Sequence, residues 1–378
     1  MYIKDTKIPR VLYKVQSLSR PDSTLLFLLA ENSNYDIPAL IEGLNVLNIN
    51  FVGAVFPGLI YGEDRYDKGI VVKSIDSNQT FLCQDTNTAD FQLDQMDDFI
   101  TNDLEPHSTA LILIDGLMDQ KQSLLEALYQ KLGSKVQYLG AGAGSLSLKQ
   151  QPCVFNKDGV FQDAAIISFI NAKVGIGVKH GWEELEGPLV ATDVDHQVIK
   201  ELNWKPAFEV YKEVVEFDTK KRFSDGSFFD LAKAYPFSQF KKGVENVVRD
   251  PISVNEDGSI QCLGDIPENA ILNVLKGDPD SLVGAAKQAA KDSLNSYGDA
   301  FKDSFIIDCI SRVLFLEKEF KRELAAINDV MTPTGQKPSE GVLSLGEVSF
   351  LGRGYLEFLN KTVVVSAFYD REIKGTSS

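Results

Sequence analysis

The chain has 378 residues, of which 44% are hydrophobic and 24% are charged, a composition typical of a globular protein long enough for two domains. Its 54 acidic residues outnumber 38 basic ones, and the formal net charge of -16 argues against binding to nucleic acid or to a membrane through a polybasic surface. The sequence contains neither an apolar run of the ~20 residues that a spanning helix needs nor an apolar signal core at its start. We therefore expect a cytoplasmic protein without membrane insertion.

Cysteine and histidine are too sparse and too scattered for common metal sites. The four cysteines, at positions 83, 153, 262 and 309, form no Cys-x-x-Cys pair, which argues against a structural zinc site or a disulfide framework. The only histidines are His107, His180 and His196. An enzyme built on a histidine cluster is therefore not expected.

The first passage of the chain predicts a strand, a helix and two more strands. After a leader over residues 1–23, the apolar run 24–30 reads as a buried strand. Residues 37–47 have helical spacing, with Pro38 in the first turn, where its missing N–H does little harm. Strands are expected over 50–61 and 68–75.

A second passage repeats this order. A strand over 109–114 is followed by a helix over 121–132, which places four leucines on one face. A strand over 136–144 comes next, and 163–170 with 172–179 is expected to form a hairpin around Asn171. The similar order predicts duplicated β-α-β-β units.

The second half of the chain continues with a helix over 206–216, short strands within 258–274 and a helix over 280–297. A third version of the unit follows, with a strand over 304–309, a helix over 317–331 and a hairpin over 338–362 that turns at Gly352-Arg353-Gly354. Because hairpins intervene between helices, we expect an α+β fold of mixed or antiparallel sheets with packed helices, built from repeated β-α-β-β units in two domains.

Two early motifs have both a structural and a functional interpretation. Gly140-x-Gly142-x-Gly144 follows a strand, but Ser145 stands where a dinucleotide fingerprint needs glycine, so close packing of backbones is the better interpretation. His180-Gly-Trp182 ends a strand. His180 is either a hydrogen-bonded structural residue or a group that points into a cavity beside Trp182, where it could ligate haem.

Polar residues near the C-terminus are the main candidates for ligand binding. Arg312 follows a strand end and needs a carboxylate, which Glu347 or a ligand could supply. Glu347 and the Asn360-x-Thr362 element are expected to face each other within the hairpin. Cys309 is interpreted as a core residue, with a nucleophile as the alternative.

These motifs together resemble the FIST-domain proteins, a bacterial sensory family. The resemblance covers roughly residues 24–370 and is carried by the motifs already named: Gly140–Gly144, His180-Gly-Trp182, Cys309-x-x-Arg312, Gly346-Glu347 and Asn360-x-Thr362, together with the stretch 190–207 and Tyr211 in the helix that follows. The chain departs from the family in the glycine-rich stretch, where the family often has Gly-Gly-x-x-Gly-Asp and this chain has Ser145, so a role tied to that acid does not carry over. The resemblance implies an N-terminal domain over 24–218, a C-terminal domain over 219–370 and a tail over 371–378.

The same resemblance implies a non-enzymatic, cytoplasmic, stand-alone module for signal transduction. Such a module would bind a small ligand and signal to a partner, such as a histidine kinase or a cyclic-dinucleotide signalling protein. The expected ligand contacts are Arg312, Glu347, Asn360, Thr362, Trp182 and Cys309. Two kinds of bound molecule remain possible. One is a small polar metabolite resembling an amino acid. The other is haem for nitric oxide sensing, with His180 as axial ligand and His107 or His196 as the alternatives. An enzyme that uses Cys309 and a structural scaffold are the remaining alternatives.

Overall fold

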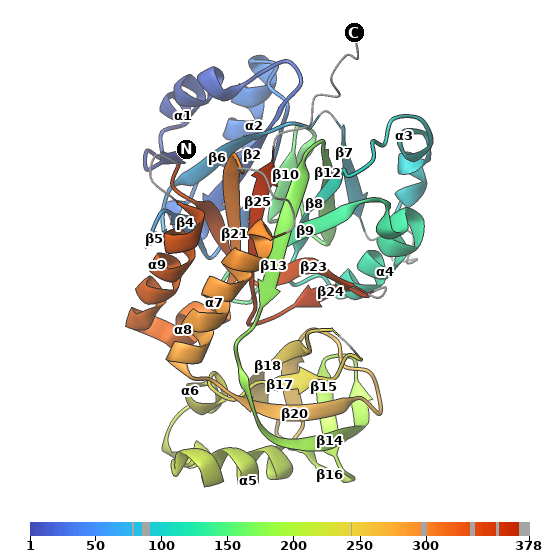
Figure 1. The fold of residues 1–378 in the computed structure, drawn as a ribbon, viewed down its shortest axis with the longest axis vertical. Helices are drawn as coiled ribbons and strands as arrows, with labels where there is room; N and C mark the ends of the chain where they lie inside the picture. The colour runs from blue at the N-terminus through green and yellow to red at the C-terminus, as the bar shows by residue number, and fades with distance from the viewer. Residues whose placement is uncertain are drawn as a thin grey trace.

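The computed structural model describes residues 1–77, 79–84, 91–242, 244–295, 301–332, 337–352 and 355–369. Within these residues the chain forms two domains, one above the other in Figure 1. The larger domain contains residues 1–179 and 279–369, and the smaller domain contains residues 183–276. The fold is α+β with mixed sheets, as predicted.

Three passages of the larger domain share one arrangement, in which two parallel strands joined through helix lie beside an antiparallel strand. The strands of the three units are β2 (Thr24–Ala30), β3 (Phe51–Phe56) and β6 (Ile70–Ile75); β8 (Thr109–Asp115), β9 (Gln137–Ala143) and β12 (Ala164–Ile170); and β21 (Asp303–Cys309), β22 (Glu340–Ser344) and β25 (Val363–Tyr369). The connecting helices are α2 (Ile37–Val46), α4 (Lys121–Leu132), and α8 (Ile310–Leu316) with α9 (Phe320–Met331). This confirms the predicted repeated units.

Each unit also lends a hairpin to the sheet of another unit. The three hairpins are β4 (Gly58–Tyr61) with β5 (Asp64–Tyr66), β10 (Val154–Asn156) with β11 (Gly159–Phe161), and β23 (Glu347–Gly352) with β24 (Tyr355–Leu359). Strand β4 pairs with β22, β10 pairs with β3, and β23 pairs with β9. With the strands β1 (Tyr2–Ile3), β7 (Gln79–Gln84) and β13 (Lys173–Lys179), these pairings give three six-stranded sheets among the described residues. The three units are thereby interlocked in a cycle.

The three sheets enclose one shared hydrophobic core. Leu28, Leu113 and Val342 come from different sheets, pack in the same cluster and are at most 1% exposed. Helices cover the outer faces: α1 (Ile8–Val15) and α2 on the first sheet, α3 (Asp97–Asn102) and α4 on the second, and α7 (Pro279–Leu294), α8 and α9 on the third (Figure 1). Because both faces of each sheet are buried, the central strands are continuous apolar runs instead of alternating ones.

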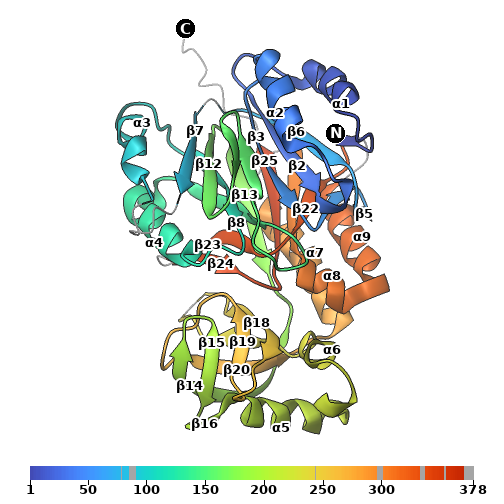
Figure 2. The ribbon, with the colours of Figure 1, turned by 180° about the vertical axis from the view of Figure 1, so that it is seen from behind.

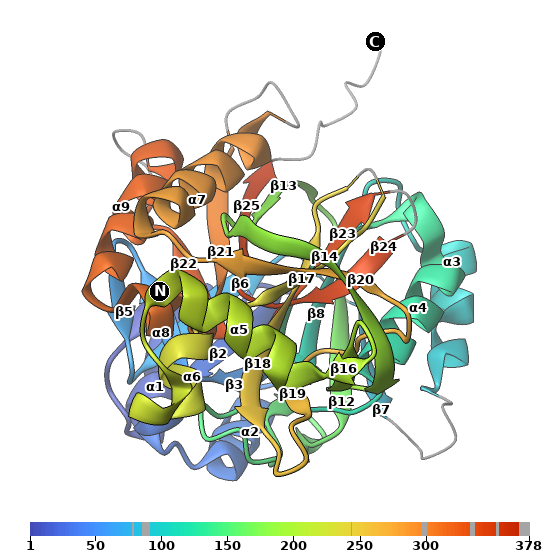
Figure 3. The ribbon, with the colours of Figure 1, turned by 90° about the horizontal axis from the view of Figure 1, so that it is seen from below.

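The smaller domain is an antiparallel sheet closed on itself. Its strand order is β14 (Glu183–Asp195), β20 (Ile271–Lys276), β17 (Phe237–Gln239), β18 (Val247–Val254), β19 (Ile260–Leu263), β15 (Val198–Leu202) and β16 (Lys205–Pro206). A further pairing of β14 with β15 completes the closure. Helix α5 (Ala207–Thr219) lies across the side away from the larger domain, with α6 (Phe228–Ala232) beside it (Figures 1 and 3). Tyr211 on α5 is fully buried in this core.

Two short stretches join the domains. His180–Trp182 leads from β13 to β14, and residues 277–278 lead from β20 back to α7 (Figures 1 and 2). Gly181 has a φ of +77°, a backbone conformation that favours glycine. A Cβ atom on Gly277 would lie 2.4 Å from the ring of Trp182. The two stretches therefore pack against each other and form one narrow connection.

Of the two predicted hairpins, one has the right strands but the wrong partners, and the other forms over only part of its expected length. The strands around Asn171 do not pair with each other, because β12 pairs with β7 and β8 whereas β13 pairs with β25. In the stretch 338–362, only β23 and β24 form a hairpin, and Arg353 and Gly354 of its expected turn lie outside the described residues. Glu347 pairs with Leu359, and Asn360–Thr362 lies in the connection between β24 and β25, so the two elements do not face each other across a ladder.

Other elements differ less from the prediction. The expected strand over 50–61 is two strands in different sheets, and helix α8 directly follows β21, ahead of the helix expected over 317–331. The expected leader contains β1 and α1, with Val11 and Val15 fully buried. The expected boundary at 218–219 falls at the end of α5, inside the smaller domain.

The contact between α7 and β13 provides a test of this packing. A Cβ atom on Gly177 would lie 1.8 Å from the carbonyl oxygen of Ala289, so Gly177→Ala forces two backbones apart. We expect it to lower the free energy of unfolding by about 1–3 kcal/mol, as overpacking does. The matched control is Gly284→Ala on α7, where nothing lies within 4 Å of the new atom. Denaturant unfolding should show the control unchanged or slightly stabilised, and equal effects of the two variants would contradict the packing.

Candidate functional site

The structure brings the predicted site residues together where the two domains meet. Cys309 ends β21, Arg312 lies on α8, Glu347 begins β23, and Asn360 and Thr362 flank Lys361 in the connection before β25. The indole N–H of Trp182, in the link between the domains, donates to the carbonyl oxygen of Lys361 at 3.0 Å. The backbone N–H of Thr362 donates to Glu347 at 3.3 Å, and that of Cys309 to the carbonyl oxygen of Thr362 at 3.2 Å.

Arg312 is fully buried, and all five of its N–H groups have acceptors. Nε and Nη2 bind the two carboxylate oxygens of Glu323, at 2.9 and 2.6 Å. Nη1 donates to the carbonyl oxygens of His180 and Lys361, and Nη2 also donates to that of Leu282. The partner carboxylate is therefore Glu323 and not Glu347, and the guanidinium has no N–H left for a ligand in this arrangement.

Three carboxyl groups lie around this single guanidinium. Asp308 is fully buried, 3.4 Å from Nε of Arg312, and neither carboxyl oxygen has a hydrogen-bond partner among the described residues. Burial and the adjacent negative charge of Glu323 raise the pKa of Asp308 well above its usual range. Burial lowers the pKa of Arg312, but Glu323 and Asp308 outweigh that effect and raise it. The cluster thus keeps its cation charged and holds a proton on an acid.

Glu347 is the third acid of the cluster. It accepts hydrogen bonds from the hydroxyl of Ser344 at 2.6 Å and from the backbone of Thr362. Burial raises the pKa of Glu347 to about 8, although these hydrogen bonds act in the opposite direction. At neutral pH this side chain is therefore mostly protonated.

A second buried ion pair crosses from one domain to the other. Lys361 lies 3.1 Å from Asp250 of β18 and donates to the carbonyl oxygen of Lys233 at 2.9 Å. Its Nζ also stands 4.7 Å from the centre of the Trp182 ring. Asp250 accepts from the hydroxyl of Ser311 at 2.6 Å. Neither charge was predicted from the sequence, although Lys361 lies inside the Asn360-x-Thr362 element and Asp250 follows Arg249 within the strand that starts at Val247.

Asn360 is the exception in this network. It is fully buried, yet neither its Oδ1 nor its Nδ2 has a hydrogen-bond partner among the residues that the structure describes. It faces Gly264 of the smaller domain, where a Cβ atom would lie 3.0 Å from Oδ1. An amide with two donors and an acceptor thus lies unpaired at the domain contact, which is costly unless something binds it.

Two further buried cations border this position. Arg249 of β18 is 2% exposed and Lys121 at the start of α4 is 4% exposed. Burial lowers the pKa of both, while Glu357 opposes the effect at Arg249 and Asp265 opposes it at Lys121. Neither residue was predicted. The available signal was a charged residue within the apolar strand around Val247 and a lysine directly before the apolar face of a predicted helix.

His180 and Trp182 are held by local contacts. Nδ1 of His180 accepts the backbone N–H of Trp182 at 3.0 Å, which leaves the proton of a neutral ring on Nε2, 3.5 Å from Glu245. Burial lowers the pKa of His180, although Glu245 acts in the opposite direction. An axial haem ligand must offer the iron an unprotonated nitrogen, so His180 as placed here does not fit that role.

The glycine-rich stretch lies inside a sheet. A Cβ atom on Gly140 would lie 2.7 Å from the carbonyl oxygen of Ile112, and one on Gly142 would lie 2.8 Å from the Phe358 ring. These glycines serve the close approach of neighbouring strands, which confirms the structural interpretation.

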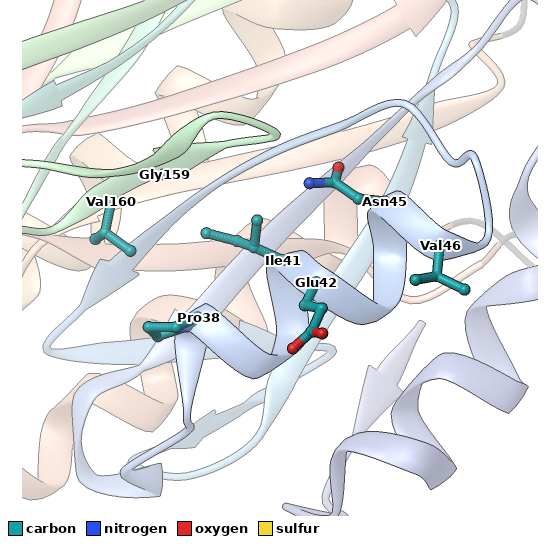
Figure 4. Close-up of a pocket in the computed structure, with 7 residues that line it drawn as sticks. All are labelled: Pro38, Ile41, Glu42, Asn45, Val46, Gly159 and Val160. Carbon is teal, nitrogen blue, oxygen red and sulfur yellow. The ribbon is translucent and has the colours of Figure 1, made fainter.

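A shallow groove of about 530 Å³ lies elsewhere, between α2 and the β10–β11 turn (Figure 4). It is lined by Pro38, Ile41, Glu42, Asn45, Val46, Gly159 and Val160. Only Glu42 of these carries a charge, so this groove offers little to recognise a polar ligand.

The described residues offer neither a metal site of the common kind nor a membrane-spanning helix. No group of three or more His, Cys, Asp or Glu side chains is arranged to hold a metal ion there. Every helix in the described ranges is too short or too polar to cross a bilayer.

Comparison with known families adds two matches. Residues 22–205 match the FIST N domain, and residues 207–349 match the FIST C domain. Together the matches cover most of the chain. No curated protein matches it.

The Arg312 network predicts a large loss of stability when the cation is removed. Arg312→Met leaves the carboxylate of Glu323 buried without its counter-ion, and breaking such a pair costs about 3–5 kcal/mol. Denaturant unfolding of Arg312→Met should show this loss, and adding Glu323→Gln should recover part of it. An unchanged midpoint in the single variant would contradict the role of this pair. Arg322→Met on the surface pair with Asp280 serves as control, with an expected loss of at most about 1 kcal/mol.

The raised pKa of Glu347 predicts how stability depends on pH. The folded state holds a proton on this group up to pH about 8, whereas the unfolded state releases it near its ordinary pKa of about 4.3. Stability is thus fully present below that lower pKa and falls as pH rises toward 8, by on the order of a few kcal/mol.

Replacing Glu347 with Gln should remove this contribution, so the melting temperature of the variant should fall less than that of the wild type between pH 5 and 8. Asp308 and Asp250, whose pKa values are also raised by burial, account for the slope that remains. The exposed substitution Glu213→Gln is the control. Parallel curves for wild type and Glu347→Gln would refute the assignment.

Proposed function

The chain belongs to the FIST-domain family, a family of sensory domains, and on that premise we propose that it senses a small polar ligand bound between its two domains. The observation that carries this proposal is the buried, unpaired amide of Asn360 at the domain contact. Ordinary folded structure pairs such groups. A ligand with a complementary donor and acceptor would pair this one.

The position of Asn360 supports a route from binding to signal. The polypeptide chain crosses between the two domains only at residues 180–182 and 277–278. The covalent connection is therefore confined to one narrow region. A ligand that contacts both domains would favour one relative arrangement over others, because binding shifts a conformational equilibrium toward the state that binds best. Arg312 would act here as the residue that holds the link, through His180 and Leu282.

The other predicted site residues would then hold Asn360 in position. These residues are Glu347, Thr362, Trp182 and Cys309. Glu347 and Thr362 bind each other, and Trp182 binds the backbone of Lys361 beside Asn360. These contacts fix the connection between β24 and β25. We assign the direct ligand contact to Asn360 and a positioning role to the others.

The enzyme alternative finds little support at Cys309. The thiol is 1% exposed, and burial raises its pKa well above the ordinary value, with the nearby Glu347 adding to the effect. A nucleophilic cysteine needs an accessible thiolate. A sensory role without catalysis is therefore the better proposal.

The haem alternative is less well supported than a polar ligand, because His180 presents no free nitrogen. An absorption spectrum after incubation with haemin tests it directly, since a sharp Soret band lost in His180→Ala would revive it. The output partner would be another signalling protein, such as a histidine kinase or a cyclic-dinucleotide protein, that recognises one domain arrangement.

Asn360 provides a test that separates a ligand contact from a structural role. Asn360→Leu removes an unpaired amide, so the unliganded variant should be as stable as the wild type or more stable. Titration calorimetry with the common amino acids and their amides should detect binding to the wild type and at least a tenfold weaker affinity in Asn360→Leu.

The matched control is Asn328→Leu, because this buried amide donates to Gly62 and Leu324 at 2.9 Å each. That variant should be destabilised and should keep its affinity for the ligand. The proposal fails if no compound produces heat at high protein concentration, or if Asn360→Leu binds as the wild type does.

A further inference from the structure

We infer that the ligand carries a carboxylate group, and that Arg249 from the smaller domain and Lys121 from the larger domain bind it. This inference rests on the proposed function, because it names the chemistry of the ligand at the same domain contact. The observation behind it is that both buried cations have N–H groups near Asn360 without an acceptor among the described residues.

Only some of the N–H groups on the Arg249 guanidinium have acceptors among the described residues. Nε donates to the carbonyl oxygen of Asp265 at 2.9 Å, and Nη1 donates to those of Val248 and Phe358 at 3.3 and 3.1 Å. Nη2 makes no hydrogen bond among the described residues, and its ion-pair partner Glu357 stands 3.8 Å away. The carboxylate of Glu357 is itself bound by Lys241. Two N–H groups of a 2% exposed arginine are therefore available.

Lys121 likewise has a donor left. Its Nζ donates to the carbonyl oxygen of Met118 at 2.9 Å. Gln197 of the smaller domain places its amide oxygen 3.3 Å from Nζ when the amide is oriented to satisfy both of its ends. An ammonium group has three N–H donors, so one remains.

The contacts of Phe358 and Gly264 show that Lys121, Arg249 and Asn360 lie close to one another. Lys121 lies over the ring of Phe358, 5.5 Å from its centre, while Arg249 binds the carbonyl oxygen of the same residue. A Cβ atom on Gly264 would lie 3.0 Å from Oδ1 of Asn360 and 3.1 Å from Nε of Arg249. Gly264 also has a φ of +83°, so both its conformation and the space beside it favour glycine.

The unused donors suit a carboxylate better than a larger anion. Nη2 of Arg249 can donate a charge-assisted hydrogen bond to a carboxylate oxygen, and the ammonium of Lys121 adds a further donor and a second positive charge. A phosphate would need more donors than this position offers. The nearby acids Glu357, Asp265, Asp119 and Asp115 partly offset the two cations, which favours a singly charged anion over a multiply charged one.

The experiment uses acetate as the carboxylate probe and acetamide as its neutral counterpart, at constant ionic strength set with chloride. We expect acetate to raise the melting temperature of the 378-residue chain saturably and acetamide to leave it unchanged. The acetate effect should be lost in Lys121→Met, retained in Lys121→Arg and weakened in Arg249→Gln. Lys131→Met on the same helix, where the lysine pairs with Asp94 and Asp97, should respond as the wild type does.

The outcomes separate this inference from the proposed function. If acetate acts no differently from chloride, or if Lys121→Met keeps the full response, the inference is overturned. If the amino acids and their amides bind equally well and Asn360→Leu abolishes both, the proposed function stands while the carboxylate is excluded. If acetate acts through Lys121 but no larger compound binds, the anion site stands and the sensory proposal fails.

Discussion

The guanidinium of Arg312 is the constraint on which both the domain link and the acid cluster depend. Its five donors bind one carboxylate and three backbone carbonyl groups, and those carbonyls belong to the link, to α7 and to the connection before β25. A planar, fully protonated group is suited to this task because its donors point in fixed directions. Lysine, with a single charged atom, could not reach all of these acceptors at once. The acid cluster then exists because a buried cation needs negative charge nearby.

Much of the fold could be predicted from local pattern. Continuous apolar runs located the central strands, and the predicted helix over 121–132 agrees with α4 to the residue. What pattern could not provide was the pairing of strands far apart in the sequence. The runs before and after Asn171 look like a hairpin, yet their partners are β8 and β25. Strand register depends on which apolar surfaces meet, and that depends on the whole core.

The sequence predicted only part of the candidate site, because some of its residues come together only through contacts between the two domains. Arg312, Glu347 and Asn360 stood out because polar groups beside apolar strands need partners, and they do lie together. Arg249, Asp250 and Lys121 were missed because their relevance comes from the smaller domain folding back onto the larger one. The sequence left open whether Arg312 faces Glu347 or a ligand carboxylate, whereas its position on α8 turns it toward Glu323.

The cyclic exchange of hairpins has a consequence for how the chain can be made. Strand β4 ends at Tyr61, but its partner β22 begins at Glu340. At 5–20 residues per second, a ribosome needs on the order of half a minute to produce that partner. During this interval the apolar strand β4 has an unpaired edge, which is a known route to aggregation. Newly synthesised chains would therefore depend on chaperone protection until the last strands emerge. A fragment that stops at the end of the FIST N match, at residue 205, would never bury that edge.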